Sequence, residues 1–206
     1  MPGRVTTPRL PHYKFRQQNR QSQMKQYIYR INKADQITYV NSDWLDFARE
    51  SDAYELTESS VLGTSIWDFV SGADTRLLYE SIFSRLRANN NEVIIPFRCD
   101  SPTIIREMEL ALCSMPNECI QMVGRLLSRR ERPYTPLLDP GVSRNKKEII
   151  ICSFCRRIQV TEGTWSEVEA AVVRLRAFSH SNAPRLIESV CSQCREKVSY
   201  VNAVRK

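Results

Sequence analysis

Residues 149–155 read Ile-Ile-Ile-Cys-Ser-Phe-Cys, and residues 191–194 repeat the Cys-x-x-Cys spacing as Cys-Ser-Gln-Cys. The apolar run before the first cysteine predicts a strand that enters a tight turn. Such a turn points two thiolates at one ion, and four thiolates form the closed tetrahedral shell that zinc prefers in structural sites. We therefore predict a zinc site with four ligands: Cys152, Cys155, Cys191 and Cys194.

Other interpretations of these cysteines stay open. Buried thiols in a metal-free core are one alternative, and a redox pair is another. A thioredoxin-like pair sits in a βαβ unit, which the pattern does not predict here. Catalytic zinc is not expected, because four thiolates leave no open position. Arg156 and Arg195 stand where covalent haem attachment needs histidine, so we exclude it.

The spacer between the two pairs has 35 residues, more than a usual zinc ribbon. Thr164 and Glu167 fit a capping box, and an apolar face continues from Trp165 through Leu175. We therefore expect a helix from Thr164 through Ala177 that packs over the metal site. A short final helix is expected over residues 195–204.

Length and composition bound the class of protein. With 206 residues, 42% of them hydrophobic, the chain has room for one ordinary domain and a small one. No apolar run approaches the roughly 18 residues of a membrane helix, and the N-terminus lacks the apolar segment of a secretory signal. We expect a cytoplasmic protein without membrane contact, in which seven cysteines serve as thiols and not as a disulfide framework.

The positive charge is concentrated at the N-terminus. Residues 1–26 hold six basic and no acidic residues, which leaves 24 basic and 23 acidic residues in the rest of the chain. We expect a flexible basic arm here, either simply solvated or in contact with phosphates or an acidic partner. Prolines and charges also dominate residues 129–148, which predicts a linker.

Residues 27–128 predict an α+β fold. Period-two or apolar runs indicate five strands, at residues 27–31, 37–40, 92–99, 107–112 and 120–127. Short helices, the first capped by Asn41 or Ser42, and a longer helix over residues 74–88 lie between the second and third strands. Tight turns between neighbouring strands imply a five-stranded antiparallel sheet with the helices on one side.

This order of elements resembles a PAS domain over about residues 27–128. The resemblance rests on residues 37–42 (Ile-Thr-Tyr-Val-Asn-Ser), 62–69 (Leu-Gly-Thr-Ser-Ile-Trp-Asp-Phe) and 96–100 (Pro-Phe-Arg-Cys-Asp). The third segment is similar to a narrower group of bacterial PAS proteins that carry a cysteine-rich tail.

Residues 149–206 are similar to that tail, a zinc-ribbon-like signalling module. In the family, basic residues follow the first cysteine pair, a Trp-led helix comes next, and a His-Gly-x-Cys-x-x-Cys segment ends the pattern. Arg156 and Trp165 match the first two features, but Glu188-Ser189 replaces His-Gly. A metal role of that histidine is therefore missing here, and His180 is at best a loop substitute.

The resemblance also implies a ligand pocket between sheet and helices. Its candidate lining residues are Trp44, Trp67, Phe69, Phe97 and Arg98, with Arg106 as a second polar candidate. An aromatic set of this kind equally fills a plain core. Neither His12 nor His180 lies in the region, and the Asn-Cys-Arg-Phe flavin motif is missing. The ligand therefore stays unknown.

No nucleotide-binding glycine loop or nucleophile–base constellation is visible in the sequence, so we do not expect an enzyme. The resemblance implies a sensory or signalling adaptor that acts through protein–protein contacts and forms dimers through the PAS-like domain. One alternative is a nucleic-acid-binding regulator that uses the zinc module and the basic arm, with a patch of five arginines: Arg156, Arg157, Arg174, Arg176 and Arg185. The other is a thiol redox sensor.

Overall fold

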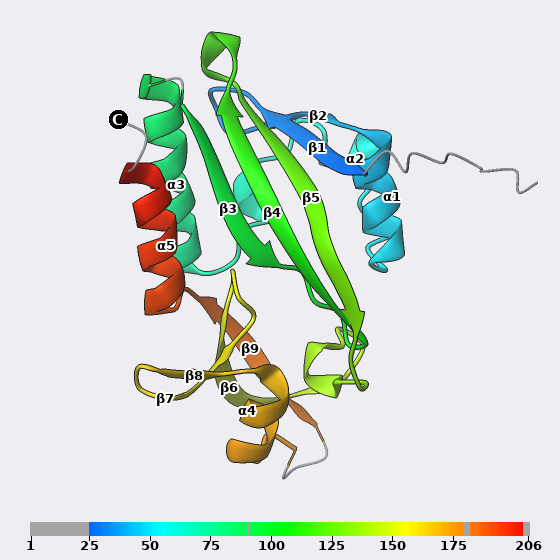
Figure 1. Cartoon of the computed structure of the whole chain (residues 1–206). Coiled ribbons are helices and arrows are strands. Elements are labelled where there is room, and N and C mark those ends of the chain that lie inside the picture. Colours follow the sequence, from blue (N-terminus) through cyan, green and yellow to red (C-terminus); the bar gives the residue numbers. More distant parts are fainter. Residues whose placement is uncertain (1–24, 90, 179–181, 204–206) are drawn as a thin grey trace, which may run out of the picture.

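The computed structural model describes residues 25–89, 91–178 and 182–203 (Figure 1). Its larger sheet has five antiparallel strands in the order β2-β1-β5-β4-β3. These strands are β1 (Gln26–Ile31), β2 (Ile37–Val40), β3 (Glu92–Arg98), β4 (Ile104–Ser114) and β5 (Ile120–Glu131). The predicted α+β class and the five-stranded antiparallel sheet are confirmed.

Alternation along the strands gives this sheet one apolar face. Val93 lies opposite Leu112, Leu112 opposite Met122, and Met122 opposite Tyr29. One row of apolar side chains therefore crosses four strands, because residues in register on paired strands share a face. Buried side chains of the helices pack in the same core as this row.

Four helical segments follow β2: α1 (Ser42–Glu50), α2 (Glu58–Val61), η1 (Ile66–Asp68) and α3 (Ala73–Asn89). Asn41 caps α1 by accepting a hydrogen bond from the Trp44 N–H at 3.0 Å, as the sequence allowed. Ile82, Phe83 and Leu86 of α3 are fully or nearly fully buried. The helix thus presents one apolar stripe to the core.

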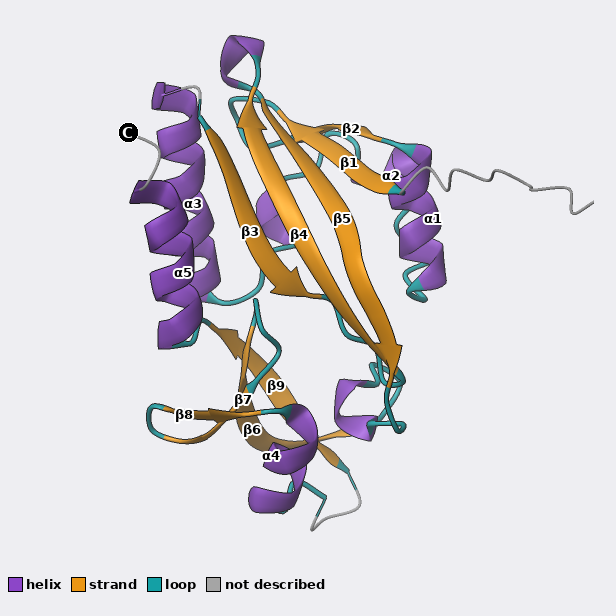
Figure 2. Ribbon diagram, viewed as in Figure 1, coloured by secondary structure: helices purple, strands orange, loops and turns teal. Residues whose placement is uncertain are grey.

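The C-terminal part contains a second sheet in the order β8-β7-β6-β9 (Figure 2). Its elements are β6 (Arg144–Cys152), β7 (Ile158–Thr161), β8 (Thr164–Ser166), α4 (Val168–Arg174), β9 (Ala183–Ser189) and α5 (Ser192–Ala203). β6 and β9 are parallel neighbours. A parallel pair needs a crossover connection, and β7, β8 and α4 supply it.

The expected linker at residues 129–148 is instead ordered structure. β5 runs to Glu131, a short helix η3 covers Pro136–Leu138, and β6 begins at Arg144. The Arg144 guanidinium donates hydrogen bonds to the carbonyls of Leu137, Asp139 and Pro184. Proline and charge do not mark a loose chain here, because the charged side chain binds backbone carbonyls and Leu137 is fully buried.

The expected helix from Thr164 through Ala177 is wrong at both ends. Thr164 lies in β8 opposite Thr161, and α4 begins at Val168 without a side-chain cap. The Glu167 carboxylate cannot complete a capping box because it accepts hydrogen bonds from Arg98 and Arg157. The final helix also begins three residues earlier than expected, at Ser192.

α4 packs away from the cysteines. Val168 and Ala171 belong to a small apolar cluster with Ile149, Ile151 and Ile158. The cysteine residues belong to the main core instead, together with the apolar face of the five-stranded sheet. The expected helix over the metal site is therefore not formed by α4.

The expected boundary between residues 148 and 149 does not separate two cores. Phe154, Val190 and Val198 are buried in the same cluster as Ile95 of the five-stranded sheet. α5 packs on β3, and α3 contacts β9. The C-terminal segment thus completes the core of the sheet in front of it.

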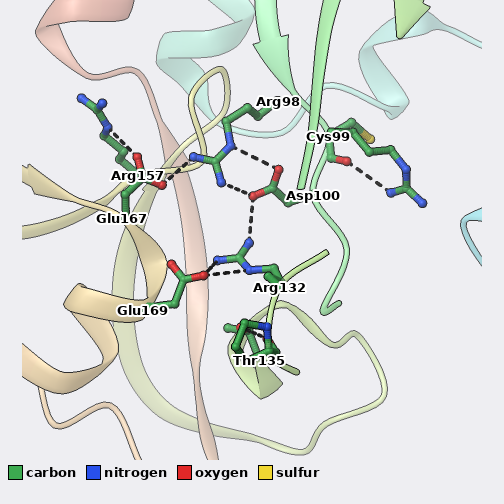
Figure 3. A network of polar contacts seen from close by, with 10 residues as sticks. Arg98, Cys99, Asp100, Arg132, Thr135, Arg157, Glu167 and Glu169 are labelled. Carbon is green, nitrogen blue, oxygen red and sulfur yellow. Dashed lines mark hydrogen bonds and ion pairs between the residues drawn. The ribbon is translucent and has the colours of Figure 1, made fainter. Parts of the chain in front are cut away.

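A buried ionic network also joins the two parts (Figure 3). Asp100 and Arg132 form a pair of 2.9 Å with 0% and 1% of their side chains exposed. Asp100 also pairs with Arg98, while Arg132 reaches Glu169 on α4 at 2.6 Å. Arg98 completes the network through Glu167 at 2.6 Å. These contacts hold α4 against the far ends of β3 and β5.

None of the helices in the described residues is long and apolar enough to cross a membrane.

Replacing Arg132 tests the buried network. Arg132→Ala leaves Asp100 buried with one cationic partner, so we expect the free energy of unfolding to fall by about 3 kcal/mol. This loss of stability is at the lower end of the range for breaking a buried ion pair, because Arg98 still pairs with Asp100. Urea unfolding followed by circular dichroism measures it.

The matched control is Arg185→Ala. Arg185 pairs with Glu148 at the surface, with about half of each side chain exposed. We expect a loss below about 1 kcal/mol. Equal losses in the two variants would contradict a special role of the buried network.

Candidate metal centre

Parallel pairing brings the two cysteine pairs together. Cys152 ends β6 and lies opposite Ser189, the last residue of β9. Neighbouring parallel strands end at the same edge of a sheet, so the turn after β6 and the chain after β9 emerge side by side. The Ser153 N–H donates to the Ser189 carbonyl at 2.9 Å and fixes this arrangement.

The four sulfurs form a compact cluster. The ligand atoms of Cys152, Cys155, Cys191 and Cys194 all lie within 4.8 Å of one another. Tetrahedral zinc with bonds of about 2.3 Å would separate its sulfurs by about 3.8 Å. The sulfurs of Cys155 and Cys191 are 3.8 Å apart. The four cysteines are thus close enough to hold one metal ion, as the sequence predicts.

Backbone N–H groups support negative charge on this cluster. The Cys191 N–H donates to the Cys152 sulfur at 3.5 Å, and the Cys194 N–H donates to the Cys191 sulfur at 3.4 Å. Cys194 lies in the first turn of α5, where free N–H groups favour an anion. In the other cysteine pair, the turn after β6 ends at Arg156, whose backbone lies in the left-handed region at φ 59°.

The pKa values of the clustered thiols Cys152 and Cys155 are shifted in opposite directions. Thiol donors at Cys155 and Cys194, together with backbone N–H groups, hold the pKa of Cys152 far below its usual range despite burial. The same contact raises the pKa of Cys155 to about 12. A cation bound by all four sulfurs takes the place of these protons.

Glu188 does not act as a fifth ligand. Its carboxylate accepts hydrogen bonds from Ser153 at 3.0 Å and from Arg156 at 2.8 Å. Both donors belong to the turn that follows β6. Glu188 therefore braces the turn between Cys152 and Cys155 from outside.

A cavity of about 450 Å³ lies beside the metal centre. Its walls come from the five-stranded sheet, from α1, η1 and α3, and from the turn between Cys152 and Cys155. Ser153 and Phe154 of that turn line the cavity, and so does Glu188. The Ser153 hydroxyl forms a hydrogen bond of 2.7 Å with Thr75 on α3. The turn between Cys152 and Cys155 is thus one wall of the cavity.

Two half-buried tyrosines lie at this cavity. Tyr29 on β1 and Tyr79 on α3 line it. Burial raises the pKa of Tyr29 well above its ordinary value and that of Tyr79 to about 12. Within the described part of the chain, no hydrogen-bond partner is found for either hydroxyl. Both therefore stay protonated at neutral pH and can donate to a ligand.

The structure divides the residues predicted for the pocket. Trp44, Phe69 and Phe97 line the cavity. Trp67 packs on Phe83 and donates from Nε1 to Asp35, outside the cavity lining. Arg98 belongs to the buried ionic network.

Arg106 is likewise not a cavity group. Its guanidinium lies over the Phe47 ring and donates to the Cys99 carbonyl at 3.3 Å. His180 and residues 1–24 of the basic arm lie outside the described residues.

Three of the five arginines grouped for nucleic-acid binding are ion-paired. Arg156 pairs with Glu188, Arg157 with Glu167, and Arg185 with Glu148. These carboxylates reduce the positive charge available to phosphates. The prediction of nucleic-acid binding gains no support from this surface.

Two parts of the candidate site were not predicted from the sequence. β9 is one, although Leu186 and Ile187 stand shortly before the second cysteine pair as the isoleucines stand before the first. The polar group of Thr75, Ser153 and Glu188 is the other. No sequence spacing links these three residues, since they come from three distant segments.

Comparisons with known proteins give no indication of the function. No protein-family model matches this chain, and no curated protein matches it.

Gly72 tests the close contact between the start of α3 and β9. Its φ is +83°, and an added Cβ would lie 2.5 Å from the Glu188 carbonyl oxygen. Gly72→Ala therefore combines backbone strain of about 1–2 kcal/mol with a displaced strand. We expect a lower melting temperature by differential scanning calorimetry.

Gly63→Ala is the matched control. Gly63 has nearly the same φ, +81°, but an added Cβ would meet nothing within 4 Å. Only the backbone strain remains, so the loss of stability should be the smaller of the two. An equal loss at both positions would show that the contact with Glu188 has no cost.

Proposed function

We propose that this protein is a non-enzymatic sensory and signalling adaptor of PAS type, with one structural zinc ion bound by the four cysteines. The observation that carries the proposal is the shared core. Cys152, Cys191 and Cys194 are buried in the same cluster as the sheet and helices that surround the cavity. Metal site and cavity are thus parts of one unit.

The donor set supports zinc in a structural role. Four sulfurs close a tetrahedral shell and leave no position for a water or a substrate. Glu188 is engaged with Ser153 and Arg156 and adds no oxygen ligand. Such a centre stabilises a fold and provides no Lewis acid for catalysis.

The cavity supports a sensory role. Its volume of about 450 Å³ falls in the range of small-molecule sites, roughly 300–1,000 Å³. In this proposal a small molecule binds there and alters a surface that a protein partner recognises, with dimerisation through the PAS-like part. A cytoplasmic location accompanies the proposal, because reducing conditions keep the cysteines available to the metal.

Metal content tests the zinc site. We expect one zinc per chain when the purified protein is analysed by inductively coupled plasma mass spectrometry. The variant Cys191→Ser should lose this zinc. Since the cysteines lie in the main core, the variant should also lose near-ultraviolet dichroism from the aromatic residues of the sheet domain.

Cys119→Ser is the control, because Cys119 is a half-buried cysteine outside the cluster. It should keep one zinc per chain. A folded wild-type protein without metal would contradict the zinc site. A disulfide between the paired cysteines in that protein would favour the thiol redox sensor.

A further inference from the structure

We infer that the cavity binds a neutral, flat and mostly apolar molecule with a hydrogen-bond acceptor, and that this molecule and the metal bind cooperatively. The inference rests on the proposed function, since it names the ligand class and the regulation of the same site. Three features of the cavity carry it: its aromatic lining, its two tyrosine hydroxyls and the metal-binding turn in its wall.

The lining selects for an apolar ring system. Trp44, Phe83 and Phe154 are among the aromatic side chains that line it. Further apolar surface comes from five aliphatic side chains: Ile37, Leu56, Ile66, Val70 and Met122. Glu188 is the charged residue in the lining, and Arg156 already pairs with it. A charged ligand would lose its hydration without gaining a free counter-ion, so a neutral molecule is favoured.

The tyrosines add the acceptor. Tyr29 and Tyr79 are half-buried, and a tyrosine O–H group that is removed from water normally has a hydrogen-bond partner. Tyr29 lies on the sheet and Tyr79 on α3, so the two side chains line the cavity from different elements. A carbonyl or ether oxygen between them satisfies the donors.

Phe154 and Ser153 couple the cavity to the metal. Both residues lie between Cys152 and Cys155, within the turn that the metal would hold. The Phe154 ring stacks on Tyr79 at 6.0 Å between ring centroids, with 30° between the planes. The Phe154 carbonyl also accepts a hydrogen bond from the Arg98 N–H at 2.7 Å.

Reciprocity follows from this geometry. Metal binding fixes the turn and thereby the cavity wall, while a ligand packed on Phe154 holds the turn in its metal-binding shape. Any increase in ligand affinity caused by the metal must equal the increase in metal affinity caused by the ligand. Because a ligand packed on Phe154 also hinders opening of the turn, zinc should leave the protein more slowly when the cavity is filled.

The test uses the full zinc-loaded chain and the neutral naphthalene dye prodan, whose ketone oxygen is an acceptor. We expect saturable binding with increased, blue-shifted emission. Zinc release into excess 4-(2-pyridylazo)resorcinol is then followed with and without saturating dye. Release should slow by about 5-fold or more with dye, the lower end of typical coupling between two sites.

Three variants make the test specific. Tyr79→Phe removes one hydroxyl and should weaken dye binding by about 2- to 10-fold. Val70→Trp fills the cavity, so dye binding and the effect of dye on zinc release should both disappear. Val173→Trp, at a position on α4 that is 76% exposed, is the control and should behave like wild type.

The outcomes separate the inference from the proposed function. Dye binding that leaves zinc release unchanged overturns the coupling, while the zinc site and the sensory cavity stand. Zinc-loaded, folded protein that does not bind the dye, or Val70→Trp that binds it as wild type does, overturns the ligand assignment. Purified protein without zinc contradicts the proposed function itself.

Discussion

The structure depends on one constraint: four sulfurs must meet at the ends of two parallel strands. Cys152 and Cys191 are 39 residues apart in sequence, and only the pairing of β6 with β9 brings them together. That pairing requires the crossover through β7, β8 and α4. It also directs α5 back along β3 and places the metal-binding turn against α3. The second sheet therefore positions the cysteines.

Two interactions of opposite character fix the C-terminal part on the first sheet. Near the cysteines the contact is apolar, since Phe154, Val190 and Val198 are buried with the sheet. Farther along β3 it is ionic, through Asp100 and Arg132. Apolar burial is non-directional, whereas the ionic network defines an orientation. Together these two interactions fix the position of the C-terminal part, and with it the cavity wall formed by Ser153 and Phe154.

Much of this architecture could be read from local patterns. Period-two alternation predicted the five strands, and the cysteine spacing predicted the four side chains that meet in one cluster. The patterns failed where a distant partner changed a residue's role. Glu167 fits a capping box by spacing, but Arg98 binds its carboxylate across the domain. Arg144 lies in a stretch typical of a linker, yet its guanidinium donates hydrogen bonds to three backbone carbonyls and so fixes the chain there.

The packing of α5 on β3 has a consequence for folding in the cell. β3 is an edge strand of the five-stranded sheet, and an uncovered edge can pair with other chains. β3, β4 and β5 follow one another along the chain and can pair early, whereas α5 docks only after the distant cysteine pairs converge. If the cysteines hold zinc as proposed, loss of the metal would favour a state in which this edge is open. The cysteine cluster is thus tied to the covering of an exposed sheet edge, because Cys194 lies in the helix that packs on β3.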